Sequence, residues 1–169
     1  YVFHADTEGL NFRKAFKDAG FYLSGCCIWK KNALVLGRSP YQWIHEPCLF
    51  GWKKGGRHQW YSDRKQTTVW EYDRPKSSKD HPTMKPVPLM AYPIRNSTMT
   101  NGLVLDPFLG SGSTLIACEE TDRICYGIEL EPKFIDVIVK RYIEQAGDKG
   151  VFVLRDGKKI SYEGVALNE

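Results

Sequence analysis

Two glycines, Gly110 and Gly112, follow an apolar run that ends in Asp106. Glycine permits positive φ and lets a ligand approach the backbone closely. The helix expected to follow offers unpaired N–H groups. The G-x-G pattern lacks the third glycine of a dinucleotide fingerprint and the Gly-Lys-Ser/Thr of a phosphate loop, so it favours carboxylate and amine contacts over a pyrophosphate. Taken alone, the turn fits a plain strand-to-helix connection equally well.

A carboxylate follows this turn at a suggestive spacing. Glu129 ends the next predicted strand, 23 residues after Asp106, where an acidic side chain can accept hydrogen bonds from the two hydroxyls of a ribose. By itself, Glu129 is better explained as a solvated strand-end carboxylate or as an N-cap for a helix at Pro132. Together, the turn and the acid predict a pocket for a nucleoside cofactor.

Positive charge is concentrated in one stretch, from Trp52 to Asp80, which contains eight basic and four acidic residues. Trp60 and Tyr61 are interleaved with these basic residues, which suits phosphate contact combined with stacking on nucleobases. The alternative is a solvated basic hairpin with aromatic residues buried beneath it. The residues predicted to contact nucleic acid, two of them from the polar segment 31–45, are Arg38, Tyr41, Lys53, Lys54, Arg57, Arg64 and Lys65.

The composition limits the remaining possibilities. A chain of 169 residues with 42% hydrophobic residues is long enough for one domain with a core, and its net charge of +4 permits a polyanionic partner. Five cysteines form no C-x-x-C pair, which argues against a metal site or a disulfide framework and fits a reducing cytoplasm. No run of 18 apolar residues is present, so we expect no membrane partner.

The elements that must position these residues alternate in type. Strands are expected at 1–3, 21–29, 46–52, 67–72, 102–105, 124–130 and 151–154. Helices are expected from Asp6 or Thr7 to Gly20, at 89–94, at 113–121 and at 132–146. The segments 30–45 and 53–66 are expected to be polar loops. The strand–helix alternation after residue 102 is typical of an α/β protein with a parallel sheet covered by helices.

Three motifs in a fixed order carry a family resemblance. They are His-Pro-Thr-Met-Lys-Pro at 81–86, Asp-Pro-Phe-Leu-Gly-Ser-Gly-Ser-Thr at 106–114 and Gly-Ile-Glu-Leu-Glu-Pro-Lys-Phe at 127–134. Upstream, the strand ending in Ile-Trp-Lys-Lys and the later His45-Glu46-Pro47 fit the same pattern. The chain resembles the exocyclic-amino DNA methyltransferases of the β arrangement. The resemblance implies a Rossmann-like sheet in permuted order, mostly parallel with an antiparallel hairpin, in a single domain over residues 1–169.

The resemblance also implies a cofactor, S-adenosylmethionine, and the residues that hold it. Its methionine part would lie on Asp106, Pro107, Phe108, Gly110, Ser111, Gly112 and Ser113. Thr83 and Lys85 would line the same end of the pocket, Glu129 would bind the ribose and Leu130 would flank the adenine. The implied reaction is direct methyl transfer to double-stranded DNA, to adenine N6 in preference to cytosine N4, by a bacterial or phage-encoded protein whose segment 53–80 contacts the DNA.

One family motif, Asp/Asn/Ser-Pro-Pro followed by an aromatic residue, does not occur in these 169 residues. An exocyclic amine is a poor nucleophile, and this motif accepts hydrogen bonds from it while its ring stacks on the flipped base. We therefore expect no catalytic residue within this sequence. The motif is expected upstream of Tyr1 or on another chain, and should fill a slot between the strands at 102–105 and 1–3. The expected protein partner is either a second copy, in a homodimer, or a complementing N-terminal segment.

Other functions also fit the sequence. One is an inactive, nucleic-acid-binding remnant of a methyltransferase. Another is a methyltransferase that acts on RNA or on a small molecule.

Overall fold

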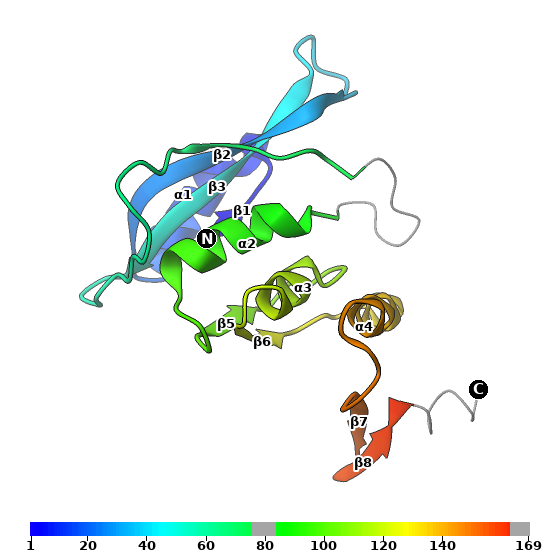
Figure 1. Ribbon diagram of the computed structural model, residues 1–169. Helices are drawn as coiled ribbons and strands as arrows, with labels where there is room; N and C mark the ends of the chain where they lie inside the picture. The colour runs from blue at the N-terminus through cyan, green and yellow to red at the C-terminus, as the bar shows by residue number, and fades with distance from the viewer. Residues whose placement is uncertain (76–83, 163–169) are drawn as a thin grey trace.

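The computed structural model describes residues 1–75 and 84–162, whose strands form three separate sheets (Figure 1). The largest sheet has the order β1-β3-β2-β4. Its strands are β1 (Val2–Phe3), β2 (Phe21–Val35), β3 (Trp43–Lys53) and β4 (Val69–Glu71). β3 pairs antiparallel with both β1 and β2, whereas β4 is parallel to β2. The strands β1, β2 and β4 therefore run in the same direction, so their carboxyl ends lie at the same end of the sheet.

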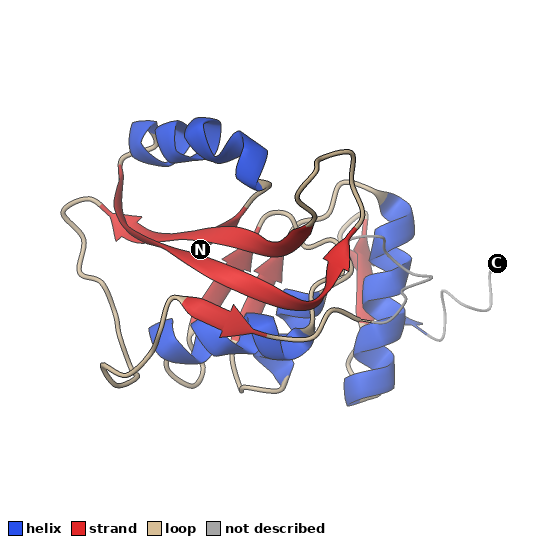
Figure 2. Cartoon of the chain, turned by 90° about the horizontal axis from the view of Figure 1, so that it is seen from above, coloured by secondary structure: helices blue, strands red, loops and turns tan. Residues whose placement is uncertain are grey.

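Helices cover both faces of this sheet. A short 3-10 helix, η1 (Asp6–Glu8), leads into α1 (Gly9–Asp18), and Gly20 then turns the chain with a φ of 80°. The predicted side-chain cap from Asp6 or Thr7 is not present, because neither η1 nor α1 has a side-chain cap hydrogen bond. α1 lies on one side of the sheet and the other helices lie on the opposite side (Figure 2).

The helix α2 (Val87–Ser97) connects the large sheet to the second one. Its Leu89 is fully buried in a cluster with Trp29, Cys48 and Trp70 of the large sheet. Two further residues of α2, Ala91 and Ile94, pack in a different cluster with α3 (Ser113–Glu119). Because apolar burial is the main favourable term in folding, α2 holds two sheets that share no backbone hydrogen bond among the described residues.

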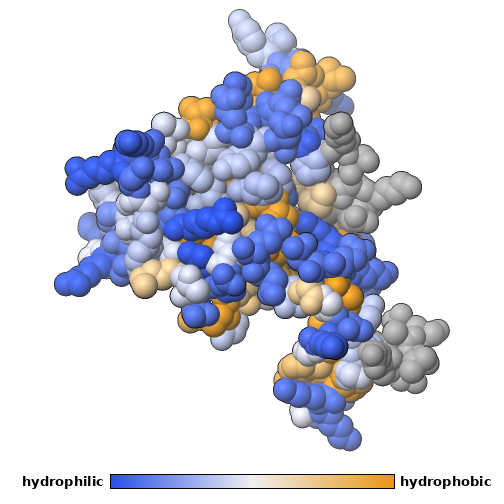
Figure 3. Space-filling model, viewed as in Figure 1, coloured by the Kyte–Doolittle hydropathy of each residue, from blue (hydrophilic) through white to orange (hydrophobic). Residues whose placement is uncertain are grey.

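The second sheet has only two strands, the parallel pair β5 (Leu103–Asp106) and β6 (Ile124–Gly127). One face packs under the helices, but the other exposes the paired side chains of Leu103 and Ile124, and of Leu105 and Tyr126, each 47–67% exposed. Apolar side chains reach the surface beside these strands (Figure 3). Among described residues, β5 and β1 each have a single strand neighbour, so each leaves one edge open.

Several predicted boundaries were wrong. The predicted loop 30–45 shrinks to residues 36–42, because β2 and β3 continue pairing as far as Val35 and Trp43. β6 ends at Gly127, so Glu129 follows the strand without belonging to it. The single, mostly parallel sheet is replaced by three sheets in which antiparallel pairs are in the majority.

The chain after α4 (Pro132–Ala146) also departs from the prediction. The predicted strand at 151–154 is present as β7 (Phe152–Arg155), but it pairs antiparallel with an unpredicted strand, β8 (Lys158–Ser161). A tight turn at Asp156 and Gly157, both with positive φ, makes this local pairing available. Among the described helices, none is long and apolar enough to cross a membrane.

Candidate cofactor site

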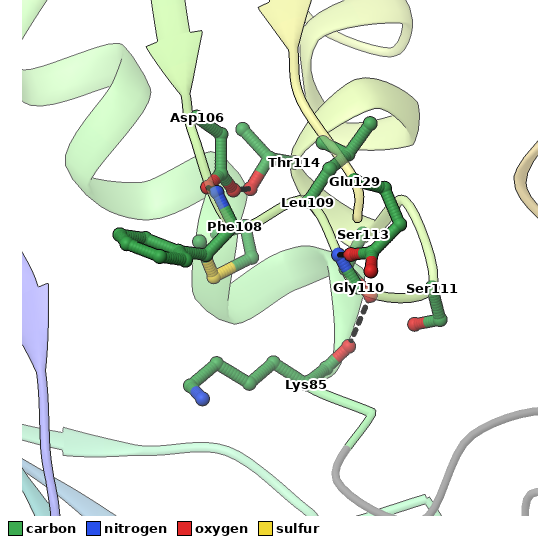
Figure 4. A pocket seen from close by; sticks show the side chains of 10 residues that line it. Lys85, Asp106, Phe108, Leu109, Gly110, Ser111, Ser113, Thr114 and Glu129 are labelled. Carbon is green, nitrogen blue, oxygen red and sulfur yellow. Dashed lines mark hydrogen bonds between the residues drawn. The ribbon is translucent and has the colours of Figure 1, made fainter. Parts of the chain in front are cut away.

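The glycine turn, residues 106–113, is held by the carboxylate with which it begins. Asp106 Oδ1 accepts a hydrogen bond from the Phe108 backbone N–H at 3.0 Å, and Oδ2 accepts one from the Thr114 hydroxyl at 2.6 Å. Thr114 is buried in the first turn of α3. The carboxylate thus ties the end of β5 to the start of α3 and fixes the path of the chain between them (Figure 4).

The two glycines of the turn are conformationally required. Gly110 and Gly112 have φ values of 59° and 82°, in the left-handed region that side chains disfavour. At Gly112, a Cβ atom would also lie 3.1 Å from the Ile138 side chain of α4. Close packing of α4 therefore adds a second reason for glycine at this position.

Glu129 closes the site from the segment that follows β6. Its Oε2 accepts the Gly110 backbone N–H at 2.7 Å and its Oε1 accepts that of Glu131 at 3.0 Å. Nearby, the Leu109 N–H donates to the Ile128 carbonyl at 2.9 Å. The acid predicted from its spacing is therefore brought onto the glycine turn, where it orders the backbone as well as presenting a carboxylate.

Lys85 connects the site to the four-stranded sheet. Its carbonyl accepts a hydrogen bond from the Ser113 hydroxyl at 2.7 Å. Its ammonium lies 3.0 Å from a carboxylate oxygen of Glu46 and 4.9 Å from the centre of the Phe3 ring. Glu46 also pairs with Lys31 at 3.4 Å. The cofactor turn and the carboxyl edge of the large sheet therefore meet at Lys85.

These contacts enclose a cavity of about 280 Å³. It is lined by Lys85, Met90, Asp106, Phe108, Leu109, Gly110, Ser111, Ser113, Thr114 and Glu129. The other described residues that were predicted for this site do not line the cavity. Gly112 is a buried residue of the turn, whereas Pro107 and Leu130 are exposed, Leu130 at 94%. Phe108 is 88% exposed and supplies an apolar wall at the opening. Thr83 lies outside the described residues.

Arg141, which supports the turn, was not predicted from the sequence. It donates hydrogen bonds from α4 to the Ser111 carbonyl and, at 3.1 Å, to the Ser111 hydroxyl. No motif marks this arginine, because the contact exists only once α4 packs beside the turn. Thr114 and Leu109 lie inside the glycine motif and could have been included on that signal alone.

Two of the cysteines, Cys27 and Cys48, are buried away from the lining of this cavity. Burial raises the pKa of the Cys27 thiol to about 11 and that of Cys48 to about 12, so both are protonated at neutral pH. Both lie in the core of the large sheet.

The predicted nucleic-acid contacts lie in two groups, at opposite ends of the strands of the large sheet. Arg38 and Tyr41 project from the loop 36–42, beyond the end of β2 where the sheet meets Lys85, and the Gln42 side chain bridges this loop from Gly37 to Ser39. The basic segment, residues 53–66, begins where β3 ends, opposite Phe21 at the start of β2. Lys53 lies seven residue steps along β3 from Glu46, a distance of about 23 Å along a strand.

The side chains of the basic segment differ in what they do locally. Lys53 donates to the Ala19 carbonyl at 2.9 Å, after the end of α1, and lies over the Phe21 ring. Lys54, Arg57, Arg64 and Lys65 extend into solvent. The single acid, Asp63, accepts hydrogen bonds from the Gln66 side chain and the Lys65 backbone, which lower the pKa of its carboxyl group.

A strand, a glycine turn and a helix, with an acid after the next strand, are typical of the Rossmann-like class of proteins. The sequence profile of the DNA methylase family, which groups N6 and N4 enzymes, matches residues 3–140. The chain therefore belongs to the N6/N4 DNA methylase family.

Individual relatives agree with this assignment. The type II methyltransferase M.Cfr9I of Citrobacter freundii is 30% identical over 150 residues, which cover 80% of this chain and 50% of the relative. The putative methylase YubD of Escherichia coli K12 is 33% identical over 119 residues, covering 70% of this chain and 50% of YubD. The chain thus spans about half the length of these curated relatives.

Solved structures show the same fold. The crystal structure of the M1.HpyAVI–SAM complex superposes with a TM-score of 0.71 at 28% identity, covering 83% of this chain and 72% of that one. The cytosine-N4-specific PvuII DNA methyltransferase has a TM-score of 0.67 at 19% identity, covering 83% and 58%. The large sheet, α2 and the glycine turn therefore form a methyltransferase framework.

Proposed function

We propose that this chain binds S-adenosylmethionine at the glycine turn and forms the cofactor-binding part of a methyltransferase that acts on DNA. The observation that carries the proposal is the contact between Glu129 and Gly110, which places a carboxylate beside a backbone that has space for a ligand. The 28%-identical neighbour is a complex with the same cofactor, and about 280 Å³ of cavity is available here.

Each part of the cavity has a separate role in this proposal. A carboxylate oxygen can accept more than one hydrogen bond, so Glu129 would accept the ribose hydroxyls while it holds the backbone of the turn. Residues 106–113 would hold the methionine part, with Lys85 and Thr83 at the same end. The exposed Leu130 side chain would provide apolar contact to the adenine. Bound S-adenosylmethionine would supply an electrophilic methyl group.

The proposed acceptor is an exocyclic amine of a base in double-stranded DNA, adenine N6 in preference to cytosine N4. This preference rests on the family resemblance alone, and mass spectrometry of nucleosides from methylated DNA distinguishes the two bases. The segment 53–80 and the loop around Arg38 and Tyr41 are the proposed contacts to DNA phosphates. The positive charge and exposure of the basic segment support this role.

The catalytic Pro-Pro motif is proposed to reach the site on a segment outside these 169 residues. Two observations support this. β5 and β1 each leave an open edge among the described residues, and the apolar face formed by Leu103, Leu105, Ile124 and Tyr126 is uncovered. Open edges and apolar faces of this kind favour pairing with another chain segment. A strand between β5 and β1 would join the two sheets that α2 already holds together.

Calorimetric titration of the 169-residue chain with S-adenosylmethionine tests the cofactor assignment, with S-adenosylhomocysteine as a ligand that shares the nucleoside. Saturable binding of both is expected, and absence of binding would contradict it. Transfer of labelled methyl groups to duplex DNA is then measured with the chain joined to the residues encoded before Tyr1. A protein that binds the cofactor but transfers nothing would support the inactive remnant, and transfer to RNA in competition with DNA would support an RNA enzyme.

A further inference from the structure

A second cavity of about 540 Å³ lies at the end of the large sheet that carries the basic segment. The residues that line it are Ser24, Phe50, Trp52, His58, Trp60, Asp63, Arg64 and Gln66. This aromatic cleft shares no lining residue with the cofactor cavity. Trp52 is six residues along β3 from Glu46, or about 20 Å.

The rings of the cleft have a fixed arrangement. The Trp52 indole stacks on the His58 imidazole with centroids 4.3 Å apart and planes inclined by 20°. Phe50 packs against Trp60 at 6.3 Å. The Trp60 indole N–H donates to the Asp63 carbonyl at 3.0 Å, which uses its polar atom within the segment. Trp60 and Phe50, which also stacks on Tyr1, both line the cleft and give it apolar surface.

The wall formed by the basic segment is held against α2. The Tyr61 N–H donates to the Asn96 carbonyl at 2.8 Å, and the Tyr92 hydroxyl donates to Gln66 Oε1 at 2.7 Å. Both contacts link the segment to a helix that is buried in two cores. A cleft whose walls are fixed before binding loses less conformational entropy when a ligand enters.

The polar groups of the cleft indicate the charge of its ligand. The side chains of Ser24, His58 and Arg64 make no hydrogen bond or ion pair with any described residue. The segment 53–66 contributes five basic residues and one acid, Asp63, whose Oδ1 already accepts two hydrogen bonds. A ligand that combines a flat aromatic group with negative charge satisfies both the rings and the free cations.

We propose that the aromatic cleft binds an unpaired nucleobase of a nucleic-acid strand. Arg64 and the neighbouring basic residues would contact the adjacent phosphates. The inference rests on the proposed function for nucleic acid as the partner, but it assigns a second site, at the edge of the sheet remote from the methyl-donor cavity. A base stacked on Trp60 would hold a displaced or flanking strand away from the cofactor.

The test measures binding of a fluorescently labelled single-stranded oligothymidylate to the 169-residue chain by anisotropy, with tryptophan quenching as a second signal. Trp60→Leu is expected to weaken binding about tenfold, as loss of one base stack does. Phe152→Leu is its matched control, because Phe152 is an aromatic residue of β7 that is 46% exposed and does not line the cleft, and it should bind like the parent. Duplex of the same length should compete less well than single strand.

Arg64→Gln tests the charge contribution without disturbing a packed ring. It is expected to lower affinity about threefold and to reduce the dependence of log affinity on log salt by about one. Arg13→Gln removes the same charge from the exposed face of α1 and should have no such effect. Equal effects of Arg64→Gln and Arg13→Gln, together with unchanged binding in Trp60→Leu, would overturn the proposal.

Two further measurements separate this site from the others. S-adenosylmethionine binding should be the same in Trp60→Leu, Arg64→Gln and the parent. If the parent bound oligothymidylate through the cleft but no S-adenosylmethionine, the proposed function would fail while the cleft assignment stood. Tryptophan quenching by polyglutamate that is equally sensitive to Trp60→Leu would instead assign the cleft to an acidic polypeptide and contradict the nucleobase.

Discussion

The glycine turn and the basic segment are two loops that follow strands, but their side chains are used in opposite ways. Asp106 and Ser113 of the turn, and Glu129 beside it, all make hydrogen bonds within the protein. In the basic segment, the cations of Lys54, Arg57 and Arg64 extend outward from a short stretch of chain. The turn is organised before any ligand arrives, whereas the segment presents charge.

This difference predicts how each region responds to substitution. Changes in the turn should alter both the stability of the fold and the affinity for the cofactor, because the same hydrogen bonds serve both. Changes to the outward cations should alter only the affinity for polyanions and should do so in a salt-dependent way. The predictions below test this separation, in order of decreasing effect.

Gly112→Ala should have the largest effect. The new Cβ would lie 3.1 Å from Ile138 at a φ of 82°, and we expect the free energy of unfolding to fall by about 2 kcal/mol. S-adenosylmethionine affinity should fall with it. Thermal unfolding and calorimetry measure the two quantities. Gly37→Ala is the control, because Gly37 has open space around it and no positive φ, and a similar loss there would remove the argument.

Glu129→Ala should chiefly affect cofactor affinity, which we expect to fall at least tenfold, since hydrogen bonds to a charged group contribute about 1.5 to 3 kcal/mol. The Gly110 and Glu131 N–H groups also lose their acceptor, so the melting temperature should fall as well. Glu131→Ala removes a neighbouring exposed carboxylate and should leave affinity unchanged. Unchanged affinity in Glu129→Ala would refute the ribose assignment.

Features that are set by the local sequence could be predicted, whereas features that depend on long-range packing could not. α4 has the predicted bounds 132–146, because Pro132 begins it and Gly147 follows its last residue. The glycine turn was also predictable, since its conformational requirement is local. The roles of Arg141 and Lys53 depend on which helices pack beside them. The separate β7–β8 hairpin replaced a predicted sheet strand because local pairing was available after residue 155.

Arg57→Gln should leave both unfolding and cofactor binding unchanged. Affinity for duplex DNA should be lower than that of the parent at 50 mM salt, and between 50 and 200 mM salt it should fall about threefold less than the parent's affinity does, because one phosphate contact has been lost. Filter binding at several salt concentrations measures the slope. A lower melting temperature in this variant would show that the segment is part of the folded framework, which would weaken the contrast with the turn.

Lys53 and Lys54 provide the finest test, because they are adjacent, equally charged and both predicted to contact DNA. The Lys53 ammonium donates to the Ala19 carbonyl after the end of α1, where a cation is favourable to the helix dipole. Lys53→Gln should therefore lower the free energy of unfolding by about 0.5 kcal/mol, while Lys54→Gln should not. Conversely, Lys54→Gln should reduce the salt dependence of DNA binding more than Lys53→Gln. Urea denaturation and the salt slope give the two readouts, and identical behaviour of the two variants in both would mean that the contact with α1 has no energetic role.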